Sequence, residues 1–172
     1  SNRFQFERFI LTQLLVMALK GVPAFYLPAL LASENDIKSF SMTGQRRDLN
    51  REKFKLDNLV SVLNNPESNA NKNIKYLGNA MDIRSKLEQF HPSSEMECLS
   101  KGRSDIVVIK RGKGPESVFA IHNMTENKIN YQLNDNDLPK IIDNDFNTQD
   151  FLTSTKYNWK NISLDPFQVI WL

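Results

Sequence analysis

The first quarter of the chain alternates between a helical pattern and a continuous apolar run. Over residues 4–19 the apolar positions form two stripes, which predicts a helix buried on two sides, and Gly21 is expected to end it. The run 22–27 is almost wholly apolar rather than alternating, which is typical of a parallel strand covered on both faces. A helix, a glycine and a buried strand in this order indicate part of an α/β layer structure.

Two further helices are predicted before the middle of the chain. Apolar residues recur at helical spacing over 51–63, and the asparagine-rich stretch 64–73, which contains Pro66, is expected to be a loop. Helical spacing resumes over 74–90 and is expected to stop at His91-Pro92.

The second half of the chain has the pattern of strands. Two β-branched and aromatic runs, 106–109 and 118–121, flank the turn-rich connector 111–115, which predicts a hairpin. Further short strands are expected at 128–133, 151–152 and 167–172.

These patterns predict two different domains with a boundary near residue 92. Residues 1–92 read as an α/β piece, and residues 93–172 as an antiparallel β-sandwich domain. The predicted fold class is therefore α/β followed by all-β.

Composition excludes several functional classes. The 172 residues carry 22 basic and 20 acidic side chains, and the net charge of +2 is too small for a nucleic-acid footprint. One cysteine and two histidines leave no disulfide framework and no thiolate-rich or multi-histidine metal site. No apolar run is long enough for a membrane helix. We therefore expect no nucleic acid, no membrane, no metal and no cofactor.

Three local motifs are assigned no function. Asp143, Asn144 and Asp145 begin a run with calcium-loop spacing, but Thr148 stands where that loop needs glycine, so we interpret the run as a solvated acidic loop. The sequons at Asn123 and Asn161 are expected by chance in an asparagine-rich chain. The two histidines, near strand or helix ends, are interpreted as structural.

The most suggestive segment is residues 43–51, which read Thr-Gly-Gln-Arg-Arg-Asp-Leu-Asn-Arg. It falls on a loop after the predicted strand and therefore at the carboxyl end of the sheet, where α/β barrels place their chemistry. The planar fork of arginine suits paired hydrogen bonds to sugar hydroxyls or oxyanions. Asp48 could hold an arginine in position or cap the following helix. The alternative is that these residues form only a solvated, charged helix start.

Four motifs in order resemble the sucrose phosphorylase branch of glycoside hydrolase family 13, within the α-amylase superfamily. They are Gly21–Tyr26, which looks like the eighth barrel strand; Leu30–Asp36 followed by Thr43-Gly44 and Arg47–Arg51; Ile83-Arg84 through Phe90-His91-Pro92; and Leu164–Leu172, which is similar to the branch's closing strand. The resemblance implies the C-terminal end of a (β/α)₈ barrel (helix 7, strand 8 and following helices) joined to a C-terminal antiparallel β-sandwich domain.

By that resemblance, the complete enzyme transfers a glucosyl unit from a glucoside such as sucrose to phosphate, with retention. The resemblance also implies that Arg47 holds the donor glucosyl ring, while Asp48 and Asn50 shape the loop. Arg46 departs from the small residue often found in the family. The family's catalytic carboxylates lie before the region matched here, so no catalytic residue is assigned to this chain.

Two functional hypotheses follow. In the first, the chain is the C-terminal portion of a sucrose-phosphorylase-like enzyme, is inactive alone and lies in the cytoplasm. In the second, it is a free-standing, non-catalytic module that binds carbohydrate or another protein. The reading frame upstream separates them, because only the first requires it to encode the remaining strands and the carboxylates.

A barrel end without its other strands would leave apolar side chains uncovered, since a complete (β/α)₈ barrel takes about 250 residues. We therefore expect a missing N-terminal barrel segment as partner, or self-association. The side chains expected to be exposed are Phe6, Phe9, Leu14, Phe25 and Tyr26.

Overall fold

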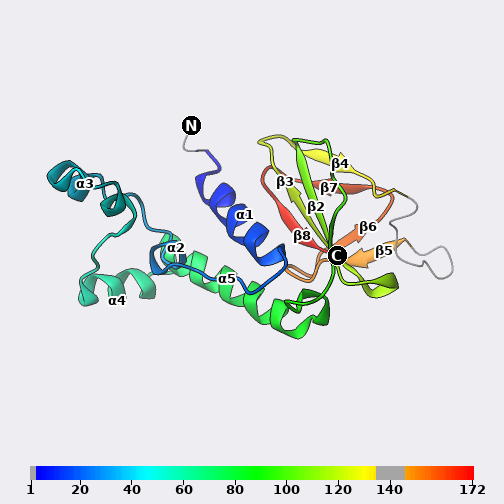
Figure 1. The fold of residues 1–172 in the computed structure, drawn as a ribbon, viewed down its shortest axis with the longest axis horizontal. Helices are drawn as coiled ribbons and strands as arrows, with labels where there is room; N and C mark the ends of the chain where they lie inside the picture. Colours follow the sequence, from blue (N-terminus) through cyan, green and yellow to red (C-terminus); the bar gives the residue numbers. More distant parts are fainter. Residues whose placement is uncertain (1–2, 135–145) are drawn as a thin grey trace. The chain divides into compact units, whose positions relative to one another are not determined.

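The computed structural model describes residues 3–134 and 146–172, and within these the chain forms two compact units (Figure 1). The sheet unit comprises Ser1–Pro23 and Asn79–Leu172, and the helical unit comprises Ala24–Gly78. The two units are defined by which residues pack together, so the sheet unit joins two segments that are distant in the sequence. The domain boundary expected near residue 92 is a separate matter and stays a prediction.

A four-stranded antiparallel sheet forms the centre of the sheet unit, in the order β1-β2-β3-β8. Its strands are β1 (Met96–Cys98), β2 (Ile106–Arg111), β3 (Val118–Asn123) and β8 (Val169–Trp171). The predicted hairpin is confirmed, because β2 and β3 pair directly and are joined through the short 3₁₀ helix η3 (Gly114–Glu116). Gly112 begins this connection at φ 83°, where a Cβ would lie 2.9 Å from Cγ of Gln89. A glycine is therefore required there.

Both faces of this sheet are covered, which explains why every residue of β3 is buried. On one face, β2, β3 and β8 contribute to a core shared with the later strands. That core contains Ile106, Val108, Phe119, Ile121, Tyr131, Leu133, Trp159, Ile162, Leu164, Ile170 and Leu172. On the other face, helix α1 (Gln5–Ala18) lies against β3 (Figure 1).

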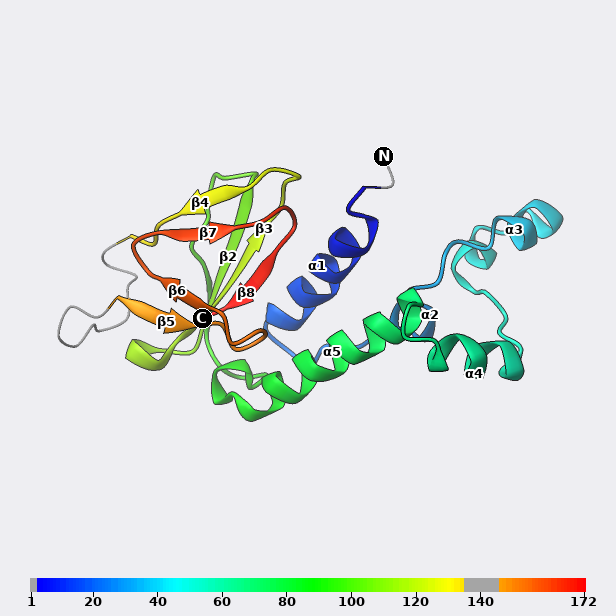
Figure 2. The same cartoon turned by 180° about the vertical axis from the view of Figure 1, so that it is seen from behind.

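Two antiparallel ribbons complete the sheet unit, and Figure 2 shows them from behind. One pairs β4 (Ile129–Tyr131) with β7 (Ile162–Leu164), and the other pairs β5 (Asn147–Gln149) with β6 (Lys156–Asn158). The strands expected within 128–133 and 167–172 are thus confirmed.

The strand expected at residues 151–152 is wrong, because these residues form a turn. The buried carboxylate of Asp150 accepts hydrogen bonds from the N–H groups of Leu152 and Thr153, both at 3.1 Å, which closes the chain into that turn. The same carboxylate accepts from the N–H of Trp171 at 2.8 Å and so ties the turn to β8.

The first predicted helix is confirmed as α1, buried on both predicted stripes, but it ends earlier than expected. Its C-cap is Leu19, which is already extended, so Gly21 at φ 114° follows the cap rather than forming it. Two arginines from later elements replace a local cap. Arg84 donates to the carbonyls of Met17 and Gly21, each at 2.9 Å, and Arg111 donates to those of Ala18 and Leu19.

The strand predicted at 22–27 is wrong. Residues 22–26 form no strand, Val22 is 79% exposed, and Leu27 begins the short helix α2 (Leu27–Leu30), with Pro28 in its first turn. A strand needs a neighbour for its backbone N–H and C=O groups. Within residues 3–134 and 146–172 no strand pairs with this segment.

The other helices of the first half are confirmed in place but differ in length. α3 (Ile37–Thr43) and the 3₁₀ helix η1 (Arg46–Asn50) lie where no helix was predicted. They are followed by α4 (Leu56–Asn64), α5 (Asn69–Lys86) and the 3₁₀ helix η2 (Glu88–Phe90).

The asparagine-rich loop is shorter than predicted because its residues begin the next helix. The Ser68 hydroxyl accepts a hydrogen bond from the N–H of Asn71 at 3.1 Å, and the Asn71 carboxamide donates to the carbonyl of Leu63 at 2.6 Å. Asn73, which is fully buried, donates to the carbonyls of Ala29 and Leu30 at the end of α2. Asparagine therefore caps helices here rather than keeping the segment irregular.

Candidate functional site

The segment with candidate chemistry forms a defined turn, which we call the arginine turn (residues 43–51). Helix α3 ends at Thr43, Gly44 follows at φ 66°, and residues 46–50 wind into η1. The left-handed conformation at Gly44 is one that side chains rarely adopt, so glycine permits this reversal directly after the helix.

Hydrogen bonds within the helical unit fix the shape of the arginine turn. The Thr43 hydroxyl donates to the carboxylate of Asp48 at 2.5 Å and accepts from the N–H of Gln45 at 3.2 Å. At the other end, the N–H of Asp36 donates to the carbonyl of Leu49 at 2.7 Å. The turn is therefore closed from both sides, by a short-range bond from Thr43 and by a bond that joins its end to the start of α3.

Asp36 also begins helix α3. Its carboxylate accepts from the hydroxyl of Ser39 at 2.5 Å and from the Ser39 N–H at 2.9 Å. These two bonds to the charged form, the hydroxyl first, lower the pKa of Asp36 below its usual value.

Arg47 presents its side chain outward from this turn. It is exposed, as are Arg46 and Asn50, and the guanidinium makes no hydrogen bond or ion pair to any described residue. All the donors of its fork are therefore available to a ligand.

Asp48 takes neither of the two roles that its position alone suggested, which were to hold an arginine or to cap the following helix. It pairs with Thr43 rather than with an arginine, and the helix that follows, α4, has Lys55 at its N-cap with no side-chain bond. Asp48 instead closes the turn. Thr43 lies only five residues before Asp48 in the sequence, so a hydrogen bond between the two side chains could have been considered from the sequence alone.

The two histidines occupy structural positions. His122 on β3 is fully buried, and its Nδ1 lies 3.3 Å from the carbonyl oxygen of Val107. Burial lowers the pKa of His122 to about 4, so the ring is neutral at physiological pH. His91 is exposed, and its Nδ1 accepts a hydrogen bond from the N–H of Ser93 at 3.2 Å.

The described residues contain neither a metal-binding cluster nor a membrane-spanning helix. No group of three or more His, Cys, Asp or Glu side chains is placed to bind a metal ion in residues 3–134 and 146–172. The run Asp143–Asp145 lies outside the described residues. None of the helices in the described part of the chain is long and apolar enough to cross a membrane.

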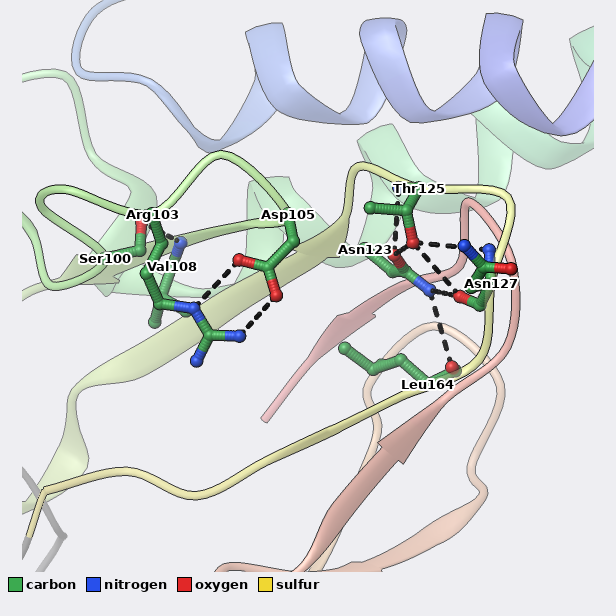
Figure 3. Close-up of polar contacts among 8 residues, drawn as sticks. All are labelled: Ser100, Arg103, Asp105, Val108, Asn123, Thr125, Asn127 and Leu164. Carbon is green, nitrogen blue, oxygen red and sulfur yellow. Dashed lines mark hydrogen bonds and ion pairs between the residues drawn. The ribbon is translucent and has the colours of Figure 1, made fainter.

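The asparagine of the first sequon, Asn123, uses its side chain in hydrogen bonds within the protein. The Asn123 side chain is fully buried and donates to the carbonyls of Asn127 at 2.7 Å and Leu164 at 3.4 Å (Figure 3). It also donates to the carbonyl of Asp165 at 2.8 Å. Its Oδ1 accepts from both the N–H and the hydroxyl of Thr125, each at 2.9 Å. This carboxamide holds the turn between β3 and β4 and is not available for a sugar.

No family model matches the chain. Three curated proteins with similar sequences are all named glucosylglycerate phosphorylase. A glucosylglycerate phosphorylase of Allomeiothermus silvanus is 30% identical over 119 residues, which is 69% of this chain and 21% of that protein. A glucosylglycerate phosphorylase of Escherichia coli is 21% identical over the whole chain and 29% of its own length. The chain thus spans less than a third of either relative.

Solved structures agree in fold. A trehalose-6-phosphate hydrolase of Bacillus licheniformis matches 98% of this chain and 39% of its own, with a TM-score of 0.68 and 16% identity. AmyP in complex with maltose matches 96% of this chain and 34% of its own, with a TM-score of 0.73 and 16% identity. The isomaltulose synthase of Klebsiella sp. LX3 has a TM-score of 0.69 and 14% identity, over 96% of this chain and 37% of its own.

The fold is that of the C-terminal part of glycoside hydrolase family 13 enzymes, with barrel-end helices followed by an antiparallel β domain. Within this class, the sequence is similar to glycoside phosphorylases. The predicted resemblance to the C-terminal portion of a family 13 phosphorylase is therefore confirmed.

Proposed function

We propose that this chain is the C-terminal portion of a glycoside phosphorylase that transfers a glucosyl unit from an α-glucoside to phosphate with retention. In this proposal Arg47 binds the glucosyl unit of the donor. The observation that carries it is the free guanidinium of Arg47 on a closed turn, in a chain similar over its whole length to a glucosylglycerate phosphorylase.

The geometry suits this role. A guanidinium donates two parallel hydrogen bonds, which match neighbouring hydroxyls of a sugar ring. The Thr43–Asp48 bond holds the backbone that carries Arg47, so less conformational entropy is lost on binding. Asn50, exposed one turn further on, offers both a donor and an acceptor.

The catalytic carboxylates belong, in the same proposal, to the rest of the parent enzyme. Retaining glucosyl transfer needs a carboxylate nucleophile and a carboxyl acid/base on opposite sides of the glycosidic bond. No carboxylate of this chain matches those of the family, so we propose that the 172-residue chain alone is inactive.

For the donor we propose glucosylglycerate before sucrose, because the curated relatives carry that name. We also propose a cytoplasmic location. Glucose 1-phosphate, the product of transfer to phosphate, is charged and is retained on the side of the membrane where it forms.

The test of Arg47 is an assay of the parent protein with phosphate and either glucosylglycerate or sucrose, scored by glucose 1-phosphate. Arg47→Ala is expected to lower kcat/KM by about 10- to 100-fold, since bonds from a charged donor are lost. Arg47→Lys keeps the charge but not the fork and is expected to recover little of the activity. Arg46→Ala is the matched control, because Arg46 is equally exposed and unpaired among the described residues. Equal activities of the Arg46→Ala and Arg47→Ala proteins would contradict the assignment.

The chain alone gives a second test. Incubated with phosphate and either donor, it is expected to produce no glucose 1-phosphate. Formation of that product, or an upstream reading frame without the carboxylates, would overturn the proposal for this chain.

A further inference from the structure

We propose that the sheet unit carries a second sugar-binding site, separate from the arginine turn. The site is a recess of about 350 Å³, which we call the Phe151 recess. Its lining includes Gln89 of η2, Glu116 of η3, Thr148 of β5, Phe151 in the turn after Asp150 and Trp159 after β6. Nothing in the phosphorylase proposal uses these residues.

An exposed aromatic ring stands in this recess on a fixed backbone. Phe151 is 44% exposed, although it lies in a unit with a large apolar core. Its N–H donates to the carbonyl of Trp171 at 2.8 Å, and it directly follows Asp150, whose buried carboxylate is fully engaged by backbone N–H groups and the hydroxyl of Thr153. The ring is therefore held out by the fold and is not part of a loose loop.

Three polar side chains in the recess lack a partner among the described residues. They are the carboxamide of Gln89, the carboxylate of Glu116 and the hydroxyl of Thr148. Thr148 is half-buried between two exposed neighbours of β5, so its side chain faces the unit rather than the solvent. Together these groups supply donors and acceptors beside an apolar face.

This combination favours a neutral, polyhydroxylated ligand with one apolar face, which describes a sugar ring. The C–H face of a sugar packs on the electron-rich face of an aromatic ring, while its hydroxyls bond to carboxylate, carboxamide and hydroxyl groups. No lysine or arginine lines the recess, and Glu116 repels anions, so a phosphorylated ligand is disfavoured. The volume lies at the low end for ligand pockets and fits one or two sugar rings.

The experiment is a chemical-shift titration of the 172-residue chain with the neutral sugars maltose and sucrose, and with glucosylglycerate, whose carboxylate is expected to weaken its binding beside Glu116. We expect saturable shifts at Gln89, Thr148 and Phe151, with a dissociation constant of about 1 mM for such an open site. Phe151→Ala is expected to weaken binding about tenfold or more, whereas Phe151→Tyr keeps the ring and is expected to retain it. The thermal midpoint of each variant checks that the fold is intact.

Two controls separate this site from the arginine turn. Tyr26→Ala removes an aromatic ring that is 54% exposed in the helical unit and is expected to leave these shifts unchanged. Arg47→Ala is also expected to leave them unchanged, so a failure of the phosphorylase proposal does not affect this one. Absence of saturable shifts with all three sugars, or equal affinities of wild type and Phe151→Ala, would overturn the proposal.

Discussion

Replacing Arg111 by methionine is expected to destabilise the sheet unit markedly. Arg111 is fully buried on β2, where its guanidinium donates to the carbonyls of Ala18 at 3.0 Å, Leu19 at 2.7 Å and His91 at 3.0 Å. It also lies over the ring of Phe90, 5.6 Å from the centroid. The carbonyls at the end of a helix carry partial negative charge and have no partner within the helix, so this cation caps α1 from a distance.

Two opposing effects set the magnitude. Losing hydrogen bonds from a charged donor and leaving three carbonyls without it costs about 1–2 kcal/mol for each carbonyl. Against this, methionine fills a similar volume and removes a buried cation that has no carboxylate partner among the described residues. Burial, and next the nearby charge of Arg84, lower the pKa of Arg111. Removing a buried cation without an ionic partner is expected to offset the loss by about 1–2 kcal/mol, from the general desolvation cost of such a charge. The net loss is expected to be about 2–4 kcal/mol.

The measurement is the free energy of unfolding from urea titration of wild type and Arg111→Met. Arg103→Met is the control, because Arg103 is 42% exposed, forms an ion pair with Asp105 and lies 5.5 Å from the centroid of the Tyr131 ring; its loss is expected to cost less than about 1 kcal/mol. An Arg111→Met protein as stable as this control would refute the reasoning, since water would then satisfy the carbonyls at no cost.

Three further outcomes are expected. Burial lowers the pKa of His122 from 6.5 to about 4, so the contribution of the neutral ring to the free energy of unfolding is complete above pH 6.5, and about 3 kcal/mol of it is lost as the pH falls to 4. In urea titrations at several pH values, His122→Gln is expected to remove this part of the pH dependence, whereas the control His91→Gln is expected to keep it. Asp150→Ala is expected to lower the free energy of unfolding by about 3 kcal/mol in the same titration, because it leaves the buried N–H of Trp171 and the N–H groups of the following turn unpaired. A loss below about 1 kcal/mol would show that the turn closes without this carboxylate. The chain alone is expected to self-associate in light scattering, and a monodisperse monomer that binds no apolar dye would contradict this; the exposed apolar side chains include Val22, Leu27, Ile37, Met42, Leu56 and Val60.

The expected exposure of the first helix is partly wrong, and the reason is physical. Leu14 is fully buried because α1 packs on the four-stranded sheet, and Phe6, Phe9 and Phe25 are half-buried. Tyr26 is exposed as expected. The pattern on α1 specifies that two stripes are buried but not which element covers them.

Local pairing made an element predictable only where the strands are also apolar. The β2–β3 hairpin joins neighbours in the chain, and its apolar runs with a glycine-containing connector are sufficient to predict it. β5 and β6 were missed because each is only three residues long and polar, so no alternation is visible. The segment 22–27 was predicted as a strand from apolar content alone, which cannot specify a partner.

Long-range polar contacts could not be predicted. Arg84 and Arg111 bind the end of α1 from more than 60 residues away in the sequence. An arginine in a strand pattern, such as Arg111, is expected to be exposed, and only the three-dimensional contact explains its burial. A loop was predicted at residues 43–51 and a turn is present there, but its expected place at the carboxyl end of a sheet depended on the strand at 22–27, which the described chain lacks. The partner of Asp48 was not predicted, because several local bonds were compatible with the same residues.

The arginine turn permits a further prediction about Arg47, since the bonds that shape the turn all lie between residues 36 and 49 and none involves this side chain. An exposed side chain without contacts contributes little to folding, so Arg47→Ala is expected to change the free energy of unfolding by less than about 0.5 kcal/mol. Thr43→Val, which removes the hydroxyl that Asp48 binds, is expected to destabilise the turn instead, by about 1 kcal/mol. If Arg47→Ala lowers stability as much as Thr43→Val does, Arg47 is a structural residue and its effect on activity cannot be attributed to binding. If stability is unchanged while kcat/KM falls, the lost interaction is with the sugar, because no contact within the described chain has been removed.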